Sequence, residues 1–120
     1  MPVYANATAS TYPADGAEIR RMLADQLALP VRFTEEIEAM YAAGARTFVE
    51  VGPGRVLGGL TAKILAGRPH LVVSCDQSGE PGIERLLVAL AEIAAAGINV
   101  DTAALFAGRE ARALDLETLP

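Results

Sequence analysis

The segment TFVEVGPGRVLGG, residues 47–59, decides the fold of this chain. Residues 47–51 form a β-branched and aromatic run, which predicts a buried strand. Gly52-Pro53-Gly54 interrupts this strand, because glycine and proline favour turns. The apolar residues that follow predict a helix over residues 56–66. The segment therefore predicts a strand, a tight turn and a helix, in the order found at the start of a β-α-β unit.

The same alternation continues on both sides of this segment. Downstream, residues 71–75 predict a second central strand, and residues 83–96 predict a long apolar helix. Upstream, residues 2–8 predict a strand, and residues 17–28 a helix that stops before Pro30. A further helix starts at Thr34 as N-cap and ends at Gly44. This order predicts an α/β fold, with a partial parallel sheet covered by helices on both faces.

The apolar periodicity also predicts which side chains face the core. They are Ile19, Met22, Leu23 and Leu27 in the first helix, Ile37, Met40 and Tyr41 in the second, and Leu86, Leu87, Leu90, Ile93 and Ala94 in the last. Residues 101–120 combine scattered apolar side chains with charges, which predicts an extended segment lying on another surface. We therefore divide the chain into a packed unit, residues 1–98, and a linker, residues 99–120.

Composition excludes several classes of function. The chain has 120 residues, a net charge of −5 and no basic run longer than Arg20-Arg21, so nucleic-acid binding is not expected. No stretch approaches the roughly 20 apolar residues of a membrane span. Cys75 is the single cysteine, which excludes an internal disulfide and fits a reducing compartment. We expect a cytoplasmic protein that binds no membrane.

The glycine turn also resembles part of a dinucleotide-binding motif. Gly52, Gly54 and Gly58 approximate the glycine spacing of that motif, and Asp76 lies near the position of a ribose-binding acid. Free N–H groups at a helix N-terminus bind anions in many folds. The structural alternative is that the glycines allow a tight turn and let the helix approach the sheet. The residues alone favour the structural alternative, because only one β-α-β unit is visible.

The remaining candidates for chemistry lack partners in the sequence. His70 is the only histidine and has no second metal ligand nearby. Cys75 fits a buried small side chain better than a nucleophile. Glu35, Glu36 and Glu38 fit a helix start and a solvated face better than paired catalytic carboxylates. We expect no metal and no self-sufficient catalytic group in this chain.

Four segments, taken in order, resemble one family. They are PVYANAT at residues 2–8, LADQL followed by PVRF at residues 23–33, GARTFVEVGPGRVL at residues 44–57, and VDTAALF followed by Gly108-Arg109 at residues 100–109. The first three resemble malonyl-CoA:carrier-protein transacylases and the acyltransferase domains of modular type I polyketide synthases. The last resembles the linker that follows those domains. The chain thus resembles the C-terminal part of an α/β-hydrolase-like acyltransferase subdomain plus its linker.

The resemblance implies a reaction and its partners. In the family, a serine takes a malonyl-type group from coenzyme A and passes it to the phosphopantetheine thiol of an acyl carrier protein, with a histidine as base. Both residues precede the region that residues 2–8 resemble, so the chain alone lacks them and binds no cofactor itself. The implied partners are the upstream acyltransferase segment, a ketosynthase with its linker domain, and the carrier protein, in a homodimeric multifunctional synthase.

One site residue carries over from the family. Gln26 matches the glutamine whose main-chain carbonyl accepts a hydrogen bond from the catalytic imidazole, and this bond fixes the tautomer and orientation of the ring. Without the resemblance, Gln26 would be interpreted as a solvated residue at a helix end. Two other functions stay open from the sequence. They are a structural or docking module without activity, and a dinucleotide-binding β-α-β unit.

Overall fold

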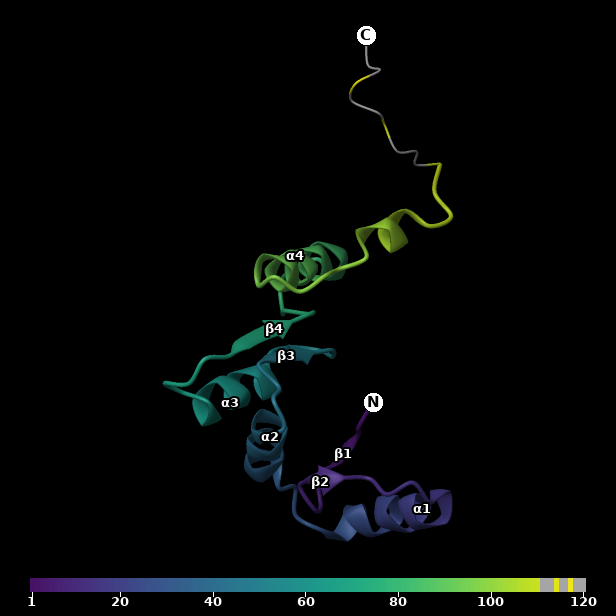
Figure 1. Ribbon diagram of the computed structural model, residues 1–120, viewed down its shortest axis with the longest axis vertical. Coiled ribbons are helices and arrows are strands. Elements are labelled where there is room, and N and C mark those ends of the chain that lie inside the picture. The colour runs from purple at the N-terminus through teal and green to yellow at the C-terminus, as the bar shows by residue number, and fades with distance from the viewer. Residues whose placement is uncertain (111–113, 115–116, 118–120) are drawn as a thin grey trace.

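The computed structural model describes residues 1–110, 114 and 117, and its elements alternate as an α/β chain (Figure 1). In chain order they are β1 (Tyr4–Ala5), β2 (Ser10–Thr11), α1 (Gly16–Asp25), the 3₁₀ helix η1 (Gln26–Ala28), α2 (Phe33–Ala42), β3 (Thr47–Glu50), α3 (Val56–Ile64), β4 (Leu71–Ser74), α4 (Gly82–Ala95) and the 3₁₀ helix η2 (Thr102–Phe106).

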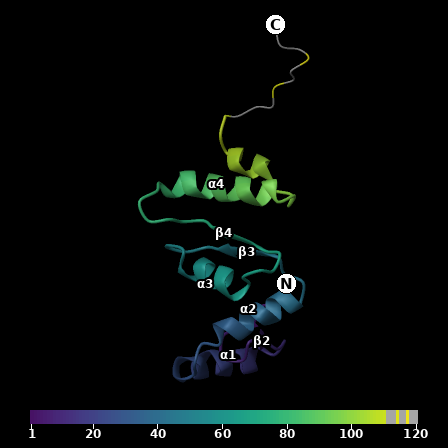
Figure 2. The same ribbon diagram turned by 90° about the vertical axis from the view of Figure 1, so that its left-hand side faces the viewer.

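The centre of the molecule is a parallel pair of strands. β3 and β4 pair in parallel, from Thr47 opposite Leu71 to Glu50 opposite Ser74. α3 lies on one face of this pair and α4 on the other, as Figures 1 and 2 both show. Val73 of β4 and Leu65 after α3 are 1% and 0% exposed, so the tightest packing lies between the strands and α3. The predicted α/β fold with helices on both faces of a parallel sheet is confirmed.

Gly58 explains how α3 comes so close to the sheet. A Cβ atom at this position would lie 2.9 Å from Glu50 Oε2, 3.0 Å from Val72 Cγ1 and 3.2 Å from Ser74 Oγ. Those distances are shorter than normal van der Waals contacts, so only glycine fits without a shift of its neighbours. The predicted close approach is therefore correct for Gly58, whereas Gly59 meets nothing within 4 Å and has no such role.

The N-terminal segment differs from the prediction. The strand predicted over residues 2–8 contracts to β1, which pairs with β2 as an antiparallel hairpin and does not join the β3–β4 sheet. The chain turns after Ala5, whose carbonyl accepts from the N–H groups of Thr8 and Ala9, and Ala9 adopts a left-handed φ of 53°. A turn closed by these local bonds ends the strand before it can extend.

The second helix also starts earlier than predicted. The N-cap of α2 is Arg32 and not Thr34, and no side chain caps this end. Arg32 has a different task, because its main-chain N–H donates to the carbonyl of Asn6, which fixes the helix start against the hairpin turn. The predicted stop is correct, since Gly44 follows α2 with a φ of 103°.

Some of the predicted inward faces are wrong. Leu23 and Leu27 of the first helical region are exposed, and so are Leu86, Leu87 and Ala94 of α4. α4 meets the sheet through Arg85 and Ala89, because the Arg85 side chain donates to the carbonyl of Ser74 at the end of β4. A polar contact therefore helps to set the rotation of α4, and part of its predicted apolar stripe is exposed, while Leu90 and Ile93 are half-buried.

The region after α4 is not simply extended. Residues 102–106 form η2, which begins where the Asp101 carboxylate accepts from the N–H of Ala103. This local cap stabilises a helical turn where an extended segment was predicted. The linker assigned to residues 99–120 also includes residues 111–113, 115–116 and 118–120, which lie outside the described part of the chain. The division at residue 98 stays a prediction.

Candidate functional site

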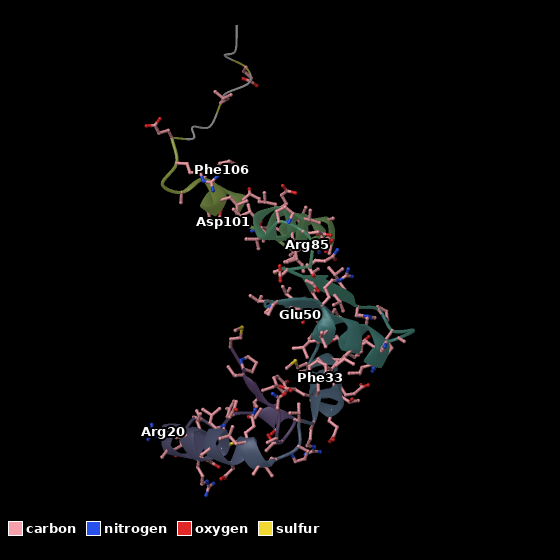
Figure 3. All side chains as sticks on the ribbon, turned by 180° about the vertical axis from the view of Figure 1, so that it is seen from behind. Arg20, Phe33, Glu50, Arg85, Asp101 and Phe106 are labelled. Carbon is pink, nitrogen blue, oxygen red and sulfur yellow. The ribbon has the colours of Figure 1, made fainter. Side chains whose placement is uncertain are left out.

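Glu50 closes the helix N-terminus that follows the glycine turn. Its carboxylate accepts from the main-chain N–H of Leu57 at 3.1 Å and from that of Gly58 at 2.7 Å. Figure 3 shows Glu50 where β3 passes into this turn, beside the start of α3. A negative charge at this position also interacts favourably with the helix dipole. The chain therefore supplies its own anion to the N-terminus of α3.

A second carboxylate holds the turn itself. Asp76, in the loop after β4, accepts from the N–H of Gly54 at 3.1 Å. Gly54 has a φ of 86°, a conformation that favours glycine. Beside this contact, Arg55 donates to Gln77 Oε1 at 2.6 Å. The loops at the carboxyl ends of β3 and β4 are thereby tied together.

These bonds decide what the turn can do chemically. In a dinucleotide site, the turn N–H groups bind a phosphate and the downstream acid binds a ribose. Here the N–H groups of Leu57 and Gly58 are bonded to Glu50, and Asp76 is bonded to Gly54. A phosphate at this place would be repelled by both carboxylates. The geometry supports the structural interpretation of the glycines.

Gln26 lies at the junction of α1 and η1. Its N–H donates to the carbonyl of Met22, and its own carbonyl accepts from the N–H of Leu29 at 3.2 Å. A carbonyl oxygen has two lone pairs, so it can accept a further donor. The side-chain Oε1 accepts from the Tyr12 hydroxyl at 3.4 Å. The neighbouring Leu27 is 95% exposed, so the turn faces open space.

An apolar groove lies between α2 and the start of α3. It has a volume of about 610 Å³, and its lining includes Phe33, Ile37, Met40, Val49, Val51 and Leu57. Phe33 starts α2 and stands between the hairpin region and the sheet (Figure 3). Val51 is 84% exposed although it directly follows β3. An apolar groove beside an unpaired strand edge is the kind of surface that packs against further polypeptide.

The other predicted candidates are not brought together. His70 is half-buried, and its Nδ1 lies 2.7 Å from the carbonyl of Arg68. Cys75 is also half-buried, and its N–H donates to the Glu50 carbonyl. Within the described residues, no group of three or more His, Cys, Asp or Glu side chains could hold a metal ion. In the same part of the chain, no helix is long and apolar enough to span a membrane.

The three glutamates of α2 have different environments. Glu35 pairs with Arg32 and Glu38 with Arg68, and hydrogen bonds from these guanidinium groups lower the pKa of both carboxyls. Glu36 is buried, and the loss of solvation raises the pKa of its carboxyl. The structure thus separates these side chains and does not form a paired-carboxylate site.

The roles of two site residues were not identified from the sequence. Tyr12 contacts Gln26 across 14 residues, and no sequence period indicates such a contact. The capping role of Glu50 has a weak signal, which is an acid directly before a glycine turn and a helix start. This pattern does not distinguish a capping carboxylate from any other acidic residue at the end of a buried strand.

Comparisons with known proteins agree with this fold. No family model matches the chain. The malonyl CoA-acyl carrier protein transacylase of Bacillus subtilis is 38% identical over 86 residues, which are 72% of this chain and 27% of that protein. The Spectinabilin polyketide synthase system protein NorA' of Streptomyces orinoci is 39% identical over 94 residues, 76% of this chain and 3% of that protein.

A solved acyltransferase structure also resembles this chain. The acyltransferase domain from the second module of the salinomycin polyketide synthase matches with a TM-score of 0.79 and 29% sequence identity. The match covers 89% of this chain and 25% of the solved chain. The chain thus spans about a quarter of the transacylase and of the solved acyltransferase.

Fold and sequence together relate this chain to one part of the α/β acyltransferases. Its homologues are malonyl CoA-acyl carrier protein transacylases and type I polyketide synthase proteins, and the part matched is consistent with the C-terminal part of an acyltransferase domain. The resemblance stated from the sequence is confirmed.

Proposed function

We propose that this chain forms the C-terminal part of an acyltransferase that loads malonyl-type extender units from coenzyme A onto an acyl carrier protein. The observation that carries the proposal is the match of 89% of the chain to a polyketide synthase acyltransferase domain. The reacting serine and histidine belong to a segment upstream of residue 1. The chain by itself is therefore inactive.

The reaction has two balanced steps. The serine oxygen attacks the thioester carbonyl while the histidine takes the serine proton, and the histidine passes this proton to the departing sulfur, so that coenzyme A leaves as a thiol. The phosphopantetheine thiol then gives its proton to the histidine and attacks the serine ester, and the histidine returns that proton to the serine oxygen as the new thioester forms. The contribution of this chain is the Gln26 carbonyl, which accepts the second imidazole N–H and keeps the ring in the tautomer that can remove the serine proton. The second lone pair of this carbonyl and the exposure of the turn support that role.

The proposed partners follow from the exposed apolar surfaces. The groove beside β3 would pack against the upstream acyltransferase segment, and the chain after α4 would lie against the ketosynthase and its linker domain. The parent synthase would be homodimeric and would present the carrier protein to the acyl group. A docking module without activity is the second candidate, favoured by the 75% exposure of Ile83 on α4.

A chimera tests the proposal. The segment of the Bacillus subtilis transacylase that matches this chain is replaced by the corresponding residues of this chain, and transfer of radiolabelled malonyl groups from malonyl-CoA to carrier protein is measured. We expect the chimera to load the carrier protein and the isolated chain to take up no covalent label. A chimera without the upstream serine controls for non-enzymatic labelling.

Two outcomes would contradict the proposal. A folded chimera that takes up no label would favour the docking module. Micromolar binding of NADP to the chain, measured by calorimetry, would revive the dinucleotide unit despite the internal bonds of Glu50 and Asp76.

A further inference from the structure

We propose that Tyr12 is a positioning residue for acyl transfer, which holds the Gln26 turn in place through the Gln26 side chain. The inference rests on the proposed function of Gln26 and adds to it a residue of the hairpin. The contact that carries it joins the Tyr12 hydroxyl to Gln26 Oε1 at 3.4 Å and is partly buried.

The Gln26 turn needs such a support because no apolar packing from the described part of this chain holds it. Neither α1 nor η1, both within the described part of the chain, contains a buried residue. Leu23 and Leu27, the apolar side chains nearest to the turn, are 52% and 95% exposed. A helix end without core contacts opens easily unless polar contacts restrain it.

The hairpin provides these contacts at both ends of the turn. On one side, the Tyr12 N–H donates to the Val3 carbonyl at 2.8 Å, and this bond fixes the Tyr12 backbone at the end of β2. The hydroxyl of the same residue donates to Gln26 Oε1. On the other side, Arg32 donates its N–H to the Asn6 carbonyl at 2.9 Å and its guanidinium to the Thr8 carbonyl at 3.4 Å. The segment from Gln26 to Arg32 is thus attached to one hairpin at its start and at its end.

The consequence concerns the direction of one carbonyl. Gln26 donates its N–H to Met22 and accepts from Leu29, and because both partners lie within residues 22–29, these bonds do not attach the Gln26 carbonyl to the hairpin. The contact from Tyr12 adds a third restraint on the same residue. Tyr12 touches no reacting atom and acts through Gln26 alone.

A double-mutant cycle in the complete acyltransferase tests the inference. Tyr12→Phe removes the hydroxyl, Gln26→Ala removes its acceptor, and each is expected to lower the loading rate about three- to five-fold. The double variant should be no slower than either single variant, because both remove the same contact. Tyr4→Phe is the matched control, since the hydroxyl of this second hairpin tyrosine has no hydrogen bond within the described residues.

Two further readouts separate positioning from general stability. The N–H of Leu29, which bonds to the Gln26 carbonyl, should exchange with solvent faster in Tyr12→Phe than in Tyr4→Phe. The acid limb of the pH profile of kcat/KM should move to lower pH, because a misplaced carbonyl stabilises the protonated imidazole less.

The outcomes distinguish this inference from the proposed function. Losses that multiply in the double variant, or a pH profile that does not move, would overturn the positioning role. Unchanged exchange at Leu29 would overturn it even in a preparation that loads no carrier protein. Absence of loading in the unmodified acyltransferase would instead contradict the proposed function, while faster exchange at Leu29 would still support the contact.

Discussion

Two turns of this molecule differ in how far their backbone groups are already hydrogen-bonded within the chain. The turn at Gly52-Pro53-Gly54 is conspicuous in the sequence, and the chain's own carboxylates occupy the N–H groups of this turn and of the following helix start at Gly54, Leu57 and Gly58. The turn at Gln26 has no glycine, and within the described residues its carbonyl accepts from one donor, the N–H of Leu29, at 3.2 Å.

The contrast teaches where a ligand or a reacting group can attach. Backbone groups bind partners only if the chain has not already paired them, because breaking an internal hydrogen bond cancels much of the gain. The glycine turn is therefore a structural joint between strand and helix. The Gln26 turn is the place where a group from another segment can be held.

The largest effect should come from breaking the backbone at the Gln26 turn. In the complete acyltransferase, Leu27→Pro should lower the loading rate more than about 100-fold, because proline distorts the preceding helical turn at a cost of about 3 kcal/mol. Gln26→Ala keeps the main-chain carbonyl and should cost less than about ten-fold. The assay is malonyl transfer, with the fold of each variant checked by circular dichroism.

Leu27→Ala is the control for this comparison. The side chain is 95% exposed in this chain, so its removal should change the loading rate little. Equal and large losses for Leu27→Pro and Gln26→Ala would show that the side chain acts directly and would contradict a main-chain role.

A methyl group added to α3 where it approaches the sheet should have the next largest effect. Gly58→Ala should lower the free energy of unfolding by about 2 kcal/mol, because its Cβ would press on Glu50, Val72 and Ser74. Gly59→Ala, one residue further on α3, meets nothing within 4 Å and should raise the same quantity by about 0.5–1 kcal/mol. Urea unfolding of the complete acyltransferase measures both. Similar effects at the two positions would mean that α3 does not pack as closely as described.

Loss of the charge at Glu50 should have a smaller effect. In Glu50→Gln one of the two oxygens that accept from Leu57 and Gly58 becomes an amide that cannot accept, at a cost of about 1–2 kcal/mol in unfolding free energy. Glu110→Gln, at an exposed position, should change it by less than about 0.5 kcal/mol. If Glu50→Gln is as stable as the parent, the N-terminus of α3 is not closed by this side chain.

Replacement of Glu36 by glutamine should give the smallest change in the free energy of unfolding, and this change should depend on pH. Burial raises the pKa of Glu36, so the folded state binds its proton more tightly than the unfolded state does. The stabilising contribution is complete below the unfolded pKa of about 4.3 and is lost as pH rises through the raised pKa of the folded state.

Glu36→Gln should therefore raise the unfolding free energy at pH 7, and this gain should vanish as the pH falls to about 4. Thermal unfolding across this pH range measures the difference. The exposed pairs of Glu35 and Glu38 respond in the opposite direction, because arginine lowers the pKa of both. A gain that grows toward low pH would show that the Glu36 carboxyl is not held in an unfavourable environment.

Local patterns predicted the elements around the sheet well. The run at residues 47–51, the second strand at residues 71–75 and the helices between and after them appear as β3, β4, α3 and α4 with small shifts at their ends. Gly44 and Gly97 follow α2 and α4 with positive φ, as expected of helix stops. These features depend on residues within a few positions of each other, so the sequence displays them directly.

The errors have a common physical origin. The strand predicted at residues 2–8 is shorter in the structure because of a hairpin turn in which Ala9 adopts a left-handed φ. The sequence has no glycine at this turn that would have indicated it. The N-cap of α2 is Arg32 instead of the predicted Thr34, because the Arg32 N–H donates to the Asn6 carbonyl and fixes the helix start there. The rotation of α4 was set by the contact between Arg85 and Ser74. Each of these three errors arises either from a contact between residues distant in the chain or from an unexpected backbone conformation.

The sequence by itself determined the alternation of strands and helices, the glycine turn and the resemblance to acyltransferases, because residue spacing and turn chemistry are local properties. Only the tertiary structure decided that Glu50 and Asp76 satisfy the glycine turn, and that Tyr12 reaches Gln26 from the hairpin. Those contacts arise when segments far apart in sequence are brought to within hydrogen-bonding distance by packing and turns.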